Sequence, residues 1–176
     1  MRFHTLLLLL VTFTHAGAAL AEGTPKPLAI PEPVEAVAEL CSAISGALAD
    51  NGKDLQKKLG RAEKLEEIPL PNRHHPDTND MRVMYRYGDG LVSLYTVPST
   101  KTTYLEAAVL TEEFWPVGVP KLLGMSRDEL KDRFGKPDEE DGERVVYLCS
   151  YETNDSINFL IKNDKVFRVV LRNIIE

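Results

Sequence analysis

The sequence predicts an α+β protein of two tandem repeats, each a short helix followed by a three-stranded antiparallel meander, with an extra N-terminal helix. Three observations support this prediction. Residues 122–137 carry a helix start, an apolar spacing and a helix stop. A fainter copy of that pattern lies at residues 54–62. Runs with the alternation typical of strands follow both copies.

The first 21 residues are predicted to be a cleaved signal peptide. Arg2 supplies the positive start, residues 6–13 an apolar core, and Ala19-Leu20-Ala21 the small-x-small pattern before a cut ahead of Glu22. A retained membrane anchor is the alternative, although the apolar run is shorter than the about 20 residues that span a bilayer. No cysteine follows the run closely, which disfavours a lipoprotein. We therefore expect a soluble periplasmic or secreted protein without a membrane span.

The mature chain, residues 22–176, is acidic. Without Arg2 it carries 20 Lys and Arg (21 minus one) against 27 Asp and Glu, a formal charge of −7. This balance disfavours a nucleic-acid partner. Residues 22–33 contain four prolines and no apolar periodicity, so an extended Pro-rich lead-in is expected.

The first repeat is expected over residues 34–113. Its leading helix has an apolar stripe at helical spacing and ends at Asn51-Gly52, and a short helix over 53–59 follows. Residues 61–80 are polar with three prolines and are predicted to form a long loop. Three strands are predicted at 82–87, 91–97 and 102–111, the first two joined by the turn Gly88-Asp89-Gly90. The stripe consists of Val34, Val37, Leu40, Cys41, Ile44 and Leu48.

The second repeat is expected over residues 114–176. Ser126 and Glu129 have the spacing of a capping box, and Gly135 with Pro137 ends the helix that they open. Strands are predicted at about 144–151, 156–162 and 166–173.

Side by side, the two halves indicate an internal duplication. Residues 54–62 and 129–137 share an apolar-x-x-x-apolar-Gly spacing, and residues 82–85 match residues 144–147. The alternative is that any helix followed by a meander resembles another.

Several short motifs of the second half resemble a known family. They are Gly124-Met125-Ser126, Glu129-Leu130, Phe134-Gly135-x-Pro137, Tyr147 and the strand ending Lys165–Val169, which resemble the SmpA/OmlA (BamE) family of outer-membrane assembly proteins. The tandem arrangement is similar to the β-lactamase inhibitor protein family, which are secreted two-repeat binders. The chain lacks the lipid-attachment cysteine of SmpA-type proteins. The resemblance therefore implies a freely diffusing binding module more than an assembly factor.

Both cysteines, Cys41 and Cys149, belong to the mature chain. An even pair in an oxidising compartment predicts one disulfide, which would pin the leading helix to the second half. The alternative is two unpaired buried thiols.

The sequence contains no recognisable catalytic site. No phosphate-binding glycine loop, nucleophile motif or Cys–His pair is present, so we expect no enzyme activity and no cofactor. His74, His75 and Asp77 could ligate a metal, but adjacent side chains diverge in extended chain, and a solvated loop is the simpler interpretation. We therefore assign no metal site and keep these three residues as candidate loop contacts.

The remaining candidates are residues of the kind that anchor interfaces. We predict an exported binding protein that recognises an envelope or secreted protein through sheet surface and loops, in the manner of an inhibitor or an assembly factor. A periplasmic protein for a small ligand or a metal is the alternative. The candidate binding residues, besides the loop 74–77, are Tyr85, Tyr87, Tyr95, Phe114, Trp115, Tyr147, Tyr151, Arg168 and Arg172.

Overall fold

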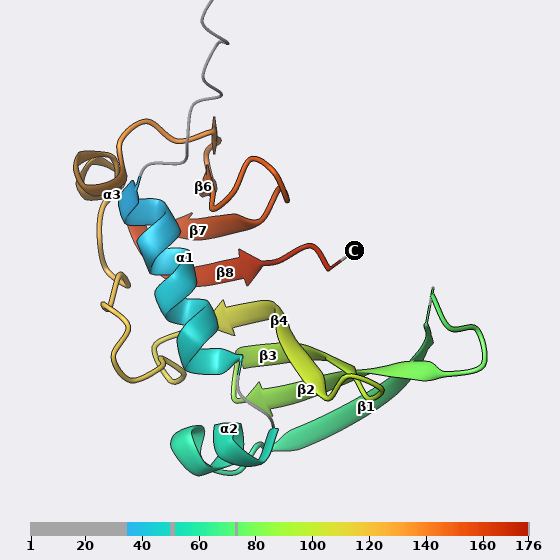
Figure 1. Ribbon diagram of the computed structural model, residues 1–176. Coiled ribbons are helices and arrows are strands. Elements are labelled where there is room, and N and C mark those ends of the chain that lie inside the picture. Colours follow the sequence, from blue (N-terminus) through green and yellow to red (C-terminus); the bar gives the residue numbers. More distant parts are fainter. Residues whose placement is uncertain (1–34, 50–51, 73, 176) are drawn as a thin grey trace, which may run out of the picture. The chain divides into compact units, whose positions relative to one another are not determined.

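An eight-stranded antiparallel sheet dominates the computed structural model (Figure 1). The structure describes residues 35–49, 52–72 and 74–175. The chain divides into two units, Met1–Ile30 and Pro31–Glu176. The expected signal peptide and the lead-in at 22–33 lie outside the described residues.

The strands follow one another along the chain but do not all pair in that order. The order across the sheet is β1-β2-β3-β4-β8-β7-β6-β5, with β4 hydrogen-bonded to β8 at its centre. The strands are β1 (Lys64–Pro71), β2 (Asn79–Tyr87), β3 (Gly90–Val97), β4 (Thr102–Leu110), β5 (Glu139–Glu140), β6 (Arg144–Leu148), β7 (Ser156–Lys162) and β8 (Lys165–Arg172).

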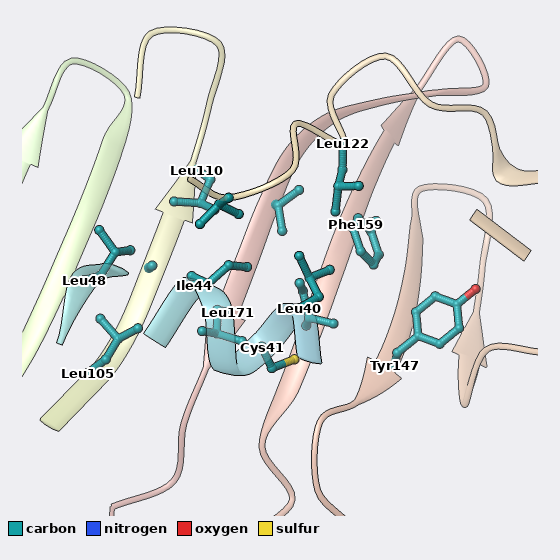
Figure 2. Close-up of a cluster of buried hydrophobic side chains, with 14 of the residues drawn as sticks. Leu40, Cys41, Ile44, Leu48, Leu105, Leu110, Leu122, Tyr147, Phe159 and Leu171 are labelled. Atoms are coloured by element: carbon teal, nitrogen blue, oxygen red, sulfur yellow. The ribbon is translucent and has the colours of Figure 1, made fainter. Parts of the chain in front are cut away.

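The helix α1 (Glu35–Leu48) crosses one face of this sheet (Figure 1). Its buried residues are Val37, Leu40, Cys41, Ile44 and Leu48, which confirms the predicted stripe. Figure 2 shows Leu40, Ile44 and Leu48 of α1 in one cluster with Leu105 of β4 and Leu171 of β8. Because these residues recur every three or four positions, they form one continuous side of the helix, and the sheet covers it.

Two shorter helices, α2 (Gly52–Leu59) and α3 (Arg127–Phe134), complete the described elements. The predicted capping box of α3 is confirmed. The Ser126 hydroxyl accepts a hydrogen bond from the Glu129 N–H, and the Glu129 carboxylate accepts one from the Ser126 N–H. Leu130 and Phe134 are buried, and the Phe134 ring lies 5.8 Å from those of Tyr147 and Phe159. This contact places α3 on the same face as α1.

The expected fold class, two tandem helix-plus-meander repeats, is wrong. Residues 107–110 of β4 pair with residues 169–172 of β8, so all eight strands belong to one continuous sheet. The physical reason is that separate meanders would leave β4 and β8 as edges with unpaired N–H and C=O groups. Alternation within a strand shows which side chains are buried, but it does not show which distant strand is the hydrogen-bonding partner.

The segment 61–80, expected to be a loop, contains β1. Pro69 and Pro71 suggested a loop, but proline is tolerated on an edge strand, where the lost N–H would face away from the sheet. Within the described part of this segment, the residues outside strands are 61–63 and those of the β1–β2 connection, which carries His74 and His75.

The predicted disulfide between Cys41 and Cys149 is confirmed. Their Cα atoms lie 6.0 Å apart, and the two residues are 108 positions apart in sequence. The bond joins α1 to the chain just after β6.

Among the described residues, no helix is long and apolar enough to cross a membrane.

Candidate functional site: the open face of the sheet

The side of the sheet opposite α1 is the best candidate for a binding surface, and we call it the open face. The strand registers place the following side chains on it: Arg82, Met84 and Arg86 from β2; Leu91, Ser93 and Tyr95 from β3; Ala107 and Val109 from β4; Arg168, Val170 and Arg172 from β8; Asn158 and Leu160 from β7; Arg144 and Val146 from β6. Among the described residues, none of these belongs to the hydrophobic core cluster. The buried residues of all three helices do belong to it, so within the described part of the chain the helices cover the opposite face only.

A small apolar centre lies in the middle of the open face. Leu91 is paired with Val109, and Val109 with Val170, so three half-buried aliphatic side chains follow one another across β3, β4 and β8. Met84 of β2 is also half-buried, and it pairs with Ser93, two residues after Leu91 in β3. The solvated face of an antiparallel sheet usually carries polar residues, so these partly exposed aliphatic side chains are unusual.

Arginines surround this apolar centre. Every arginine that lies within a strand (Arg82, Arg86, Arg144, Arg168 and Arg172) projects from the open face. Two of them are neutralised locally: Arg82 pairs with Glu106, and Arg144 with Asp141 and Glu139. The other three differ, because no ion pair of the described residues involves Arg86 or Arg172, and Arg168 meets Asp89 only at 3.9 Å. The Nε atom of Arg168 is buried without a hydrogen-bond acceptor.

A β-bulge organises the polar part of the open face. Ser93 pairs with Ala107 and Leu94 with Leu105, so Glu106 is the extra residue of β4. Its carboxylate accepts hydrogen bonds from the Arg82 guanidinium (Nε to Oε2, 2.6 Å) and from the Ser93 hydroxyl (2.6 Å). Burial acts to raise the pKa of Glu106, but the hydrogen bonds from Arg82 and Ser93 and the charge of Arg82 lower it below its ordinary value. In turn, the hydrogen bond to Glu106 raises the pKa of Arg82.

A second polar group holds the β1–β2 loop against the sheet. The buried carboxylate of Asp80 accepts hydrogen bonds from the Asn72 amide (2.9 Å) and from the Tyr95 hydroxyl. The Asn72 side-chain oxygen accepts the backbone N–H groups of His74 and His75, each at 2.8 Å. The loop is therefore anchored, and both imidazoles are presented on the surface.

Two adjoining grooves run beside this loop, with volumes of about 480 and 500 Å³. Both are lined by His74, Asp80, Tyr95 and Ile175.

Among the described residues there is no cluster of three or more His, Cys, Asp or Glu that could hold a metal ion.

Several of the predicted binding residues are part of the core instead. Tyr85, Phe114 and Tyr147 are 6%, 4% and 1% exposed, and Tyr87 stacks on Phe114 with ring centroids 4.8 Å apart. Trp115 is half-buried, and its indole N–H donates to the Val119 carbonyl (3.0 Å). The reason lies in strand parity, because residues 85 and 87 of β2 point toward the helices, whereas 82, 84 and 86 point away.

The other predicted residues reach the surface but do not form one site. Tyr95, Arg168 and Arg172 lie on the open face. His74, His75 and Asp77 lie exposed on the β1–β2 loop. Tyr151 is exposed after β6, where its hydroxyl donates to Asp138 (2.8 Å).

Arg82, Arg86, Arg144 and the apolar centre were not predicted from the sequence. The available signal was the spacing of four residues between Arg82 and Arg86 in β2 and between Arg168 and Arg172 in β8, since residues an even number apart in a strand share a face. Comparison with protein-family models, curated proteins and solved structures found no match.

Proposed function

We propose that the chain is an exported binding protein that docks another envelope or secreted protein on the open face of its sheet. The observation that carries this proposal is the one-sided cover: the helices bury one face, while half-exposed aliphatic side chains ringed by arginines remain on the other. Protein interfaces typically combine an apolar centre with a polar rim, and arginine, tyrosine and methionine are enriched in them. Export is part of the proposal and rests on the first 21 residues of the sequence.

The construction of the sheet supports recognition by a rigid surface. The disulfide fixes α1 to the β6 end, and the central β4–β8 pairing joins the two groups of strands. A preformed surface loses little conformational freedom on binding, which favours affinity.

Site-specific photo-crosslinking tests the proposal. Benzoylphenylalanine is placed at Val170, in the apolar centre, and in a matched variant at Ala43, which is exposed on α1 on the covered side. Both full-length variants are expressed in the native compartment and irradiated. We expect a discrete protein adduct from position 170 that is absent from position 43 and is reproduced when the adduct partner is purified and mixed with the protein. Equal adducts from both positions, or no protein adduct from position 170, would contradict the proposal.

A small-ligand function is the second candidate, and the grooves beside the β1–β2 loop favour it. They offer Asp80, Tyr95 and His74 within one concave surface. Changing His74 to Ala should weaken the binding of such a ligand and leave the adduct from position 170 unchanged.

A further inference from the structure

The open face carries the five strand arginines against the carboxylates of Glu66, Asp80, Glu106 and Glu139, so it is less acidic than the chain as a whole. The whole sequence has a formal charge of −6, yet all the strand arginines project from this one side. The covered face is buried under the helices, so charged strand residues are expected on the open face, but an excess of positive over negative charge there is not required by sheet formation. The excess of positive charge on the open face is therefore not a consequence of how the sheet folds.

Three of these arginines lack strong partners within the described part of the chain. Arg86 and Arg172 are exposed and make no ion pair there, and Arg168 is held only by a long contact to Asp89 and by its position over the Phe167 ring. Arg86 pairs with Leu91, whereas Arg168 and Arg172 flank Val170 along β8. The three guanidinium groups therefore border the apolar centre on two sides.

Guanidinium groups bind carboxylates in paired, planar geometry, and such pairs strengthen when an interface excludes water. We infer that the occupant of the open face is a protein surface with carboxylate side chains placed around an apolar centre. This inference rests on the proposed function and adds the chemistry of the partner.

A folded or extended acidic protein fits this surface better than a polyphosphate does. The apolar centre of Leu91, Val109 and Val170 needs aliphatic or aromatic contacts, which a sugar-phosphate backbone does not supply. A long nucleic acid would also bring charge beyond the patch, toward the acidic remainder of the molecule. A protein can confine its carboxylates to the area of contact.

Fluorescence anisotropy with a labelled poly-L-glutamate peptide at low salt tests the inference directly. The wild-type protein is compared with the double variant Arg86→Glu/Arg172→Glu and with the control Arg61→Glu/Arg133→Glu. The control reverses two exposed arginines outside the strands and changes the net charge equally. We expect the wild type and the control to bind the peptide. The change in net charge weakens both double variants alike, and we expect the open-face variant to bind about tenfold more weakly than the control. Circular dichroism verifies that each variant is folded, and Arg86→Gln/Arg172→Gln replaces the reversal if it is not.

Each other result overturns the inference. No binding of the peptide by the wild type, or equal loss in both double variants, would mean that the arginines form no acidic-partner site. Tighter binding of a DNA oligonucleotide of the same charge, or of phosphatidylglycerol vesicles, would assign the face to phosphate groups. Sedimentation velocity showing a dimer that Arg172→Glu dissociates would assign it to a second copy of the chain. The crosslink at position 170 is read separately, so a protein adduct with no charge dependence would leave the proposed function standing.

Discussion

Glu106 shows how one extra residue in a strand organises the polar part of the open face. The bulge directs its carboxylate toward Arg82 and Ser93, and the side chains of Glu106 and Arg82 are 22% and 35% exposed. A carboxylate so placed is stabilised in its charged form, and this couples its ionisation to folding.

The coupling predicts a pH dependence with a definite sign. The pKa of Glu106 is lower in the folded protein than its ordinary value of 4.5. Its contribution to the free energy of unfolding is therefore complete above about pH 4.5 and is lost as the pH falls through the lower, folded-state pKa. We expect Glu106→Gln to make urea stability less dependent on pH below about 4.5. A Glu106→Gln profile parallel to that of the wild type across this range would contradict the assignment.

Phe114 illustrates a residue whose chemistry suggested binding but whose environment is structural. It stacks on Tyr87, and a Cβ added at Gly90 would meet the Phe114 side chain at 2.6 Å, so strand, turn and ring are closely packed. We expect Phe114→Ala to lower the free energy of unfolding by about 3–5 kcal/mol, because it opens a cavity in the core.

The matched control for this change is Phe167→Ala. Phe167 is 44% exposed, so its truncation should cost about 1 kcal/mol or less. Denaturant unfolding of both variants measures the difference. Equal losses would mean that Phe114 is not part of the core.

At the scale of elements, the helices and most of the strands were predictable, but the order of the strands in the sheet was not. The stripe of α1 and the capping box of α3 are local patterns, and each specifies a face or an end by itself. The strand β1 was missed because its prolines resemble loop text, and an edge position is what makes them tolerable. The pairing of β4 with β8 is non-local, and no turn sequence records it.

The disulfide is the element-scale feature whose effect can be measured most cleanly. Because 108 positions separate Cys41 from Cys149, the chain-entropy account gives a stabilisation of about 4–5 kcal/mol. We expect the double variant Cys41→Ala/Cys149→Ala to lose about this much in denaturant unfolding. Reduced wild-type protein is the control, since it loses the bond but keeps both side chains. A loss below about 1 kcal/mol in both would mean that the bond does not constrain the unfolded chain.

At the scale of the whole molecule, the division into a covered and an open face connects fold to function. Among the described residues, the core cluster lies on the side of α1 and α3, and the arginines within strands lie on the other. Alternation in β8 predicts both sets of side chains, but only the sheet order brings Leu91, Val109 and Val170 into one row. The sequence therefore predicts which kinds of residue form the candidate site. It does not predict which of them lie next to one another on the surface.

Thiol labelling of neighbouring residues in β8 tests this division most directly. Val170 lies on the open face, and Leu171, the next residue, is 0% exposed on the covered face. A single cysteine is introduced at either position in the full-length protein, which keeps its native disulfide, and the rate of reaction with iodoacetamide is measured under native conditions. The account predicts that the Val170→Cys thiol reacts readily while the Leu171→Cys thiol is protected until the protein unfolds. Equal protection of both thiols would show that the face assigned to docking is already covered.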